Sequence, residues 1–152
     1  MVKRCQDAPT EVVCCMTKLN KDDGRRLNRE GFAVEHDIAA RLVRLGFNVA
    51  KSNASAPWDL VADWKGNVNR IQVKSVARPV KTSGRTHRVF IAEHYNKSSF
   101  DFLVVNTPWA NYVLPVEKIH RKKHLNFWDR GQHRTKRPCD FEEFREAGEL
   151  LQ

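Results

Sequence analysis

Three side chains of different chemistry, a carboxylate, an amide and an amine, are expected to meet near the middle of this chain. Asp59 belongs to a run of alternating apolar and polar residues, 58–63, and Gln72 and Lys74 belong to a second such run, 71–74. The alternation predicts two β-strands, because successive strand side chains point to opposite faces. Such oxygen donors can hold a hard cation such as Mg²⁺, and a neighbouring lysine can stabilise charge at a phosphate under attack.

The segment between the two runs predicts an antiparallel hairpin. Lys65-Gly66-Asn67 contains a glycine and reads as a turn. If the turn centres near Gly66, Asp59 lies opposite Val73 or Lys74, within reach of the facing strand. The alternative for these residues taken alone is a hairpin whose polar face is only solvated.

A second carboxylate, Glu35, is expected on a buried helix face. The segment from about residue 25 to 45 carries apolar residues at helical spacing, namely Phe32, Val34, Ile38, Ala39, Leu42, Val43 and Leu45. Glu35 projects into the middle of this apolar arc, where an ionised carboxylate is costly unless it is paired or binds a metal. Its partner is either a basic residue at the edge of the core or a site shared with Asp59.

The order of these features resembles the PD-(D/E)XK nuclease superfamily. Glu35 on a helix is followed by Gly46, a short strand over 47–50, and the two runs that carry Asp59 and Gln72-Val73-Lys74. More narrowly, the chain is similar to the branch that contains homing endonucleases encoded by group I introns, in which glutamine replaces the second strand acid. The resemblance extends to residue 119. It implies an α/β fold with a restriction-endonuclease-like core, in which helices flank a mixed central sheet of about four to five strands.

The same resemblance implies a role for each of these residues. Asp59 is the main metal ligand, and Gln72 and the backbone carbonyl of Val73 are further ligands. Lys74 is the catalytic lysine, and Glu35 is the helix acid that reaches the metal directly or through water. Gln72 brings no negative charge, so Glu35 compensates only if it reaches the ion. The implied cofactor is Mg²⁺, with Mn²⁺ as a possible substitute.

Positive charge predominates in this chain. It has 27 Lys and Arg against 18 Asp and Glu, a formal net charge of +9, which favours a polyanionic partner such as nucleic acid. The basic residues gather in two tracts, one between residues 75 and 90 and one between 118 and 137. The side chains expected to contact DNA are Arg78, Lys81, Arg85, Arg88, Arg121, Lys122, Lys123, Arg130 and Arg134.

The alternative for the first basic tract is a solvated hairpin. The second tract is expected to form a helix and then an arm along the DNA backbone, with Phe127 and Trp128 anchoring it to the core or to another subunit. At its end, Asp140 and Glu143 match a capping box. They predict a short terminal helix with one apolar side, formed by Phe141, Phe144 and Leu151.

The length of 152 residues favours one domain. We expect a single nuclease domain over residues 21–152 with a basic C-terminal region, preceded by a flexible extension over residues 1–20. The four cysteines match no paired zinc spacing and are expected to be free thiols. No apolar run has the length of a membrane span, so a soluble, cytoplasmic protein that is not secreted is expected.

The expected function is a Mg²⁺-dependent, site-specific endodeoxyribonuclease that hydrolyses phosphodiester bonds in double-stranded DNA. The resemblance favours an intron-type homing endonuclease. Because one site cuts one strand, the chain is expected to act as a homo-oligomer, a dimer or a tetramer. The alternatives are a Holliday junction resolvase or a restriction-type nuclease of the same fold, or a catalytically inactive DNA-binding protein.

Overall fold

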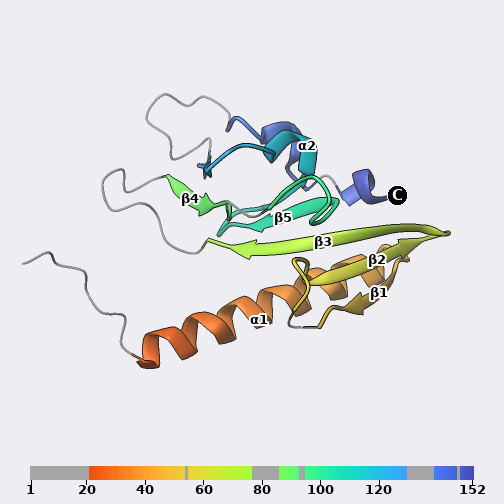
Figure 1. Ribbon diagram of the computed structural model, residues 1–152, viewed down its shortest axis with the longest axis horizontal. Helices are drawn as coiled ribbons and strands as arrows, with labels where there is room; N and C mark the ends of the chain where they lie inside the picture. The colour runs from red at the N-terminus through yellow and green to blue at the C-terminus, as the bar shows by residue number, and fades with distance from the viewer. Residues whose placement is uncertain (1–20, 54, 77–85, 93–94, 130–138, 147) are drawn as a thin grey trace, which may run out of the picture.

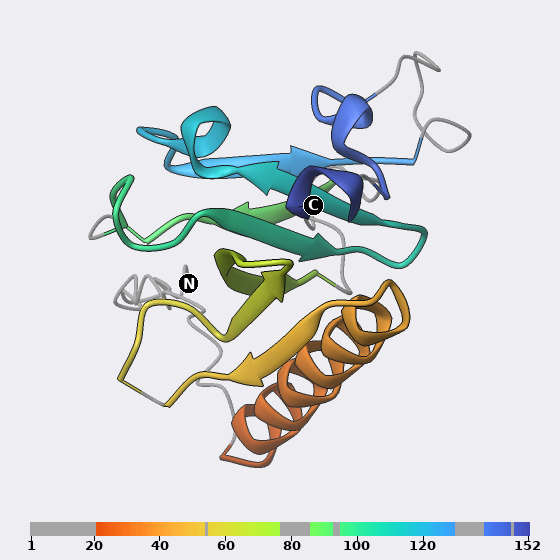
Figure 2. The same cartoon turned by 90° about the vertical axis from the view of Figure 1, so that its right-hand side faces the viewer.

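A five-stranded sheet organises the molecule, as the computed structural model shows for residues 21–53, 55–76, 86–92, 95–129, 139–146 and 148–152 (Figure 1). The long helix α1 covers one face of this sheet, and a two-stranded sheet and α2 lie on the other side (Figures 1 and 2). In chain order the elements are α1 (Lys21–Arg44), β1 (Asn48–Lys51), β2 (Leu60–Trp64), β3 (Asn67–Ser75), β4 (His87–Phe90), β5 (Phe102–Asn106), β6 (Asn111–Pro115), α2 (Val116–Ile119), β7 (His124–Phe127), and the 3-10 turns η1 (Glu142–Phe144) and η2 (Gly148–Leu151).

The central sheet is mixed, as predicted. Its strands lie in the order β1-β2-β3-β5-β6, with β3 and β5 parallel and the other neighbours antiparallel. The two-stranded sheet pairs β4 with β7 antiparallel. The predicted α/β fold with a mixed central sheet and flanking helices is therefore confirmed. Within the described part of the chain, no helix has the length and apolar character that a membrane span needs.

The β2–β3 hairpin has a different register from the predicted one. Trp64 pairs with Asn67, so the turn consists of Lys65 and Gly66, whose φ angles of 51° and 89° are both positive. Two such residues form the tight turn that matches the twist of the flanking strands. The turn thus centres half a residue before Gly66, and the register is shifted by one residue from the predicted one. The ladder ends at the Leu60–Ile71 pair, so Asp59 lies just beyond it, with its backbone N–H bonded to the carbonyl of Ile71.

The two faces of β3 serve different parts of the molecule, as the sequence alternation predicts. Ile71 and Val73 pack with Ile38 and Leu42 of α1 in one apolar cluster. Gln72 points to the other side, where Tyr95 approaches it. A second cluster on that side contains the fully buried side chains Phe100, Leu103, Val105, Tyr112, Leu114 and Phe127.

The apolar arc of α1 is buried over a narrower stripe than predicted. Ile38 and Leu42 are buried, but Phe32, Val43 and Leu45 remain 55%, 56% and 49% exposed. The strands beneath are short, four residues in β1 and five in β2, and α1 extends well beyond them (Figure 1). The N-terminal part of the helix consequently has no surface of β1 or β2 to pack against.

In its described part, residues 118–129, the second basic tract does not form the predicted helix. After Pro115 the helix α2 has only four residues, and the chain then enters β7, which contains His124. Pairing with β4 holds this segment extended. Phe127 and Trp128 are buried in the core, which agrees with the core alternative for this aromatic pair. Arg130 and Arg134 lie outside the described residues.

The predicted short C-terminal helix is also wrong. Residues 142–144 and 148–151 form separate 3-10 turns, and no side chain caps the first of them. Phe141 and Phe144 pack in the cluster around Tyr112, whereas Leu151 packs with the α1-side cluster. These apolar residues serve opposite sides of the sheet, so one amphipathic helix could not bury them all. The predicted extension over residues 1–20 lies outside the described residues.

Gly46 ends α1 in a conformation that other residues rarely adopt. Its φ is +94°, and a Cβ placed there would lie 2.9 Å from Cζ3 of Trp64. We expect Gly46→Ala to lower the free energy of unfolding by about 1–2 kcal/mol, because the left-handed backbone is strained for alanine. Denaturant unfolding measures this change. Gly24→Ala is the control, since nothing lies within 4 Å of its added Cβ; equal stability of the two variants would contradict the prediction.

Candidate active site

Asp59 lies where β3 continues past the end of β2. The pairing of the two strands begins at Leu60 and Ile71, and β3 runs on to Ser75. The backbone N–H of Asp59 donates to the carbonyl of Ile71 at 2.9 Å. Its carboxylate Oδ2 accepts the N–H of Val73 at 2.7 Å. The carboxylate of Asp59 therefore takes the place of a strand carbonyl as the acceptor for the N–H of Val73. This hydrogen bond holds the side chain against the edge of β3.

Gln72 is buried beside this carboxylate, with only 5% of its surface exposed. Its amide Nε2 donates to Oδ2 of Asp59 and to the carbonyl of Val73, at 3.2 Å from the latter. Its Oε1 accepts the hydroxyl of Tyr95 at 3.4 Å. Both contacts to the carboxylate use Oδ2, so neither occupies the other oxygen, Oδ1.

All four predicted catalytic residues line one cavity of about 470 Å³, to which α1 and β3 both contribute. The complete lining is Leu27, Glu30, Gly31, Glu35, Asp59, Gln72, Val73, Lys74, Ser75 and Val76. The helix supplies Glu35 to this cavity, and the hairpin supplies the other three. Residues far apart in the sequence are thus brought to a common space.

Glu35 has a basic partner as well as a place in the cavity. Its Oε2 lies 2.6 Å from Nζ of Lys51, and the two side chains are 22% and 38% exposed. The same ammonium lies 3.6 Å from the ring centroid of Phe32. The ion pair and the shared site were alternatives in the sequence. The structure contains the ion pair, and the same carboxylate side chain also lines the cavity.

Burial raises the pKa of Asp59 above its usual value, and the nearby charge of Glu35 raises it further. The hydrogen bond from Val73 and the positive charges of Lys74 and Lys51 act in the opposite direction without cancelling the rise. Desolvation, and then the second carboxylate, disfavour the ionised form of Asp59. A bound cation would stabilise that ionised form.

The donor types around the cavity fit a hard divalent cation. The described residues contain no group of three or more His, Cys, Asp and Glu side chains that could hold a metal. Other oxygens must complete a ligand set here, and the carbonyl of Val73 and the amide of Gln72 are beside Asp59. Carboxylate, carbonyl and amide oxygens are the ligands that Mg²⁺ and Mn²⁺ accept.

The predicted DNA-binding residues are only partly described. Arg78, Lys81 and Arg85 lie outside the described residues, as do the two arginines of the second tract noted above. Arg88, on β4, donates from Nε to Oδ1 of Asn126 at 2.9 Å. Three further basic side chains are exposed and line a separate cavity of about 210 Å³ on the α2 side, Arg121, Lys122 and Lys123.

Comparison with protein families identifies residues 28–147 as a PD-(D/E)XK endonuclease. The chain belongs to this family. Among solved structures, the PD-(D/E)XK endonuclease described here is similar to a bacterial homing endonuclease, I-Ssp6803I, with a TM-score of 0.71 and 24% sequence identity. The match covers 82% of this chain and 91% of that one, and it shows a shared fold. No curated protein matches the sequence.

Sequence reasoning did not identify Lys51 or Tyr95 as part of the site of this PD-(D/E)XK endonuclease. Lys51 is the exposed last residue of β1, with no local pattern to distinguish it from other surface lysines. Tyr95 reaches Gln72 from a loop 23 positions away in the sequence. Only packing of α1 on β1, and of that loop on β3, gives either residue its place.

The Lys51–Glu35 pair leads to a stability prediction for the PD-(D/E)XK domain. Lys51→Met is expected to lower Tm without metal by about 1–4 °C, since a partly exposed ion pair contributes about 0.2–1 kcal/mol. The rise in Tm on adding Mn²⁺ should be larger than in the wild type, because the ion then neutralises carboxylates that lost their ammonium. Thermal denaturation with and without Mn²⁺ measures both.

Arg41→Met provides the matched control. Arg41 pairs with Glu146 at 3.4 Å, away from the cavity, and both side chains are more than half exposed. Its loss should leave the response to Mn²⁺ unchanged. A Lys51→Met protein with the wild-type response would show that Lys51 does not balance the charge of this site.

Proposed function

We propose that this PD-(D/E)XK endonuclease hydrolyses phosphodiester bonds in double-stranded DNA with Mg²⁺ as cofactor and Mn²⁺ as a possible substitute. The observation that supports it most is the convergence of Asp59, Gln72, Lys74 and Glu35 on one cavity. The formal net charge of +9 is suited to a polyanionic substrate. We assign the activity to residues 21–152 as one domain.

In this proposal Asp59 holds the ion through a carboxylate oxygen, assisted by the carbonyl of Val73 and the amide oxygen of Gln72. Glu35 would reach the ion directly or through water. When bound, the ion polarises the phosphate and lowers the pKa of an attacking water. Lys74 orients that water and stabilises the negative charge that develops on the phosphate oxygens.

Gln72 donates its N–H to Asp59 in this structure, so its amide must turn for the oxygen to face the ion. Glu35 must likewise share its carboxylate between Lys51 and the site. Both adjustments are proposed as side-chain rotations.

A homing role is the specific form of the proposal. The similar solved structure is that of a bacterial homing endonuclease, and the chain covers 91% of it. One cavity of this kind per chain cuts one strand, so cleavage of a duplex requires two chains arranged by symmetry. We therefore propose a homo-oligomer, a dimer or a tetramer, acting on a long DNA site. The exposed Arg121, Lys122 and Lys123 are proposed to contact the DNA backbone.

Cleavage of a randomised duplex library with Mg²⁺, followed by sequencing of the cut ends, tests this function. A single long consensus is expected for a homing endonuclease. A short consensus would instead indicate a restriction-type enzyme, and preference for a four-way junction over linear duplex a resolvase. If no DNA is cut with Mg²⁺ or Mn²⁺ while binding persists, the protein is a DNA-binding protein and the proposed function is wrong.

A further inference from the structure

The amide of Gln72 has two chemically different ends, which an acid at the same position would not have. Only its oxygen can bind a cation, whereas its NH₂ group can only donate hydrogen bonds. Gln72 is 5% exposed, so both ends need partners within the protein. In this structure the NH₂ end faces Asp59 and the oxygen faces Tyr95. Binding a cation beside Asp59 requires the opposite orientation.

A tyrosine hydroxyl can serve as partner for either end of an amide. It donates to the oxygen, as the 3.4 Å contact with Oε1 shows, and it can accept from the NH₂ group after the amide turns. We propose that Tyr95 is a positioning residue that stabilises Gln72 with its oxygen toward Asp59 when a divalent cation binds. This inference rests on the proposed metal-dependent function and concerns how glutamine can substitute for an acidic ligand.

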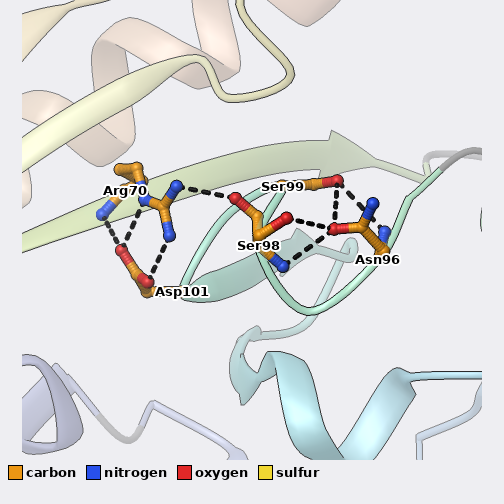
Figure 3. A network of polar contacts seen from close by, with 5 residues as sticks. All are labelled: Arg70, Asn96, Ser98, Ser99 and Asp101. Atoms are coloured by element: carbon orange, nitrogen blue, oxygen red, sulfur yellow. Dashed lines mark hydrogen bonds and ion pairs between the residues drawn. The ribbon is translucent and has the colours of Figure 1, made fainter.

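Tyr95 is well placed to act on Gln72 because its loop is attached to the same strand. Arg70, Gln72 and Lys74 alternate along β3 and so share one face. Arg70 donates from Nη1 to the carbonyl of Ser98 at 2.7 Å, and it forms a two-pronged contact with Asp101, at 3.0 Å from Nε and 2.9 Å from Nη2 (Figure 3). The loop that begins at Tyr95 is thereby held to β3.

The loop is also stiffened from within. Oδ1 of Asn96 accepts the N–H of Ser98 at 2.8 Å, and Oγ of Ser99 accepts the N–H of Asn96 at 3.0 Å (Figure 3). The ring of Tyr95 meets the fully buried ring of Phe100 edge to face, with centroids 5.2 Å apart. A hydroxyl on a ring held in this way has a narrow range of positions, as orienting an amide requires.

The ring and the hydroxyl of Tyr95 have separable tasks. Nζ of Lys74 lies 5.9 Å from the ring centroid, at the limit of a cation–π contact. Tyr95→Phe keeps the ring, its packing on Phe100 and this contact, and removes only the hydroxyl. The variant therefore tests the hydroxyl, with its contact to the amide, separately from the ring.

Titration calorimetry with Mn²⁺ alone, without DNA, tests the proposal. Tyr95→Phe is expected to weaken Mn²⁺ binding about 10–100-fold, the usual effect of losing a group that orients a metal ligand. The matched control is Tyr112→Phe, the other tyrosine of the chain, whose hydroxyl accepts from Nε1 of Trp109 at 3.0 Å. It loses a hydroxyl in the core and should bind Mn²⁺ as the wild type does.

The same substitution in a Gln72→Glu protein shows whether Tyr95 acts by orienting the amide or only by supporting the structure of the site. In Gln72→Glu the two carboxylate oxygens are equivalent, so adding Tyr95→Phe should change Mn²⁺ affinity by less than about threefold. An equal loss in both backgrounds would overturn the orienting role, as would unchanged affinity of Tyr95→Phe alone. Wild-type protein that binds no Mn²⁺ would instead refute the proposed function together with this inference.

Discussion

Asp59→Asn is expected to reduce Mg²⁺-dependent DNA cleavage by about 10²-fold or more without destabilising the metal-free protein. Activity should fall because the substitution removes the charged ligand of the proposed site. The fall should be at least as large as the one caused by removing a group that stabilises charge in the transition state. The stability result follows from the pKa. Burial and then Glu35 raise the pKa of Asp59, so folding disfavours its ionised form.

The sign of the pH dependence follows from this shift. Below the usual pKa of aspartate, the carboxyl is protonated in both folded and unfolded states and costs nothing. As pH rises through the raised pKa of the folded state, the unfolded state ionises more readily and stability is lost. The Tm of Asp59→Asn should therefore equal or exceed that of wild type at neutral pH, and the difference should shrink in acid. Cleavage by the wild type should decline as pH falls through the same pKa.

Asp63→Asn is the control for this prediction. Asp63 lies on the same strand, and its Oδ1 accepts the N–H of Gly66 at 2.9 Å in the hairpin turn. The variant should cleave DNA at close to the wild-type rate and lose some thermal stability. Near-normal cleavage by Asp59→Asn, or a marked fall in its metal-free Tm at neutral pH, would contradict the assignment of Asp59.

Lys74→Met is expected to lower the rate of DNA cleavage by about 10²–10⁴-fold, the range for loss of a positioned proton-transfer or charge-stabilising group. Methionine retains much of the length of the side chain but has no charge. Binding of Mn²⁺ and of duplex DNA should persist, because neither depends on a single ammonium. Single-turnover cleavage and a binding titration with DNA in Ca²⁺ measure the two effects separately.

Lys65→Met is the matched control for Lys74→Met, since it removes the same charge from the turn at the opposite end of the β2–β3 hairpin. It should leave cleavage unchanged. If Lys74→Met cleaved as fast as the control, Lys74 would have no catalytic role. If it lost DNA affinity in proportion to activity, Lys74 would be a DNA contact rather than a group that acts on the reaction.

The local periodicities of the sequence determined which elements form and which residues share a face. The alternation over residues 71–74 correctly predicted that Gln72 and Val73 point to opposite faces of the sheet, because a strand side chain has only two possible directions. Helical spacing located α1, and the glycine at residue 66 located the hairpin turn. These features depend on neighbours a few positions away, so they are visible in the sequence itself.

The tertiary structure decided the contacts between those elements. It paired Glu35 with Lys51, brought the carboxylate of Asp59 to the amide of Gln72, and brought Tyr95 to the same amide. Each depends on how distant segments pack, and shifts of one residue reverse which side chains meet. Residues 124–127 of the second basic tract form a strand that pairs with β4. Sequence patterns record local preference, whereas a site built from α1, β3 and a distant loop exists only once all three are packed together.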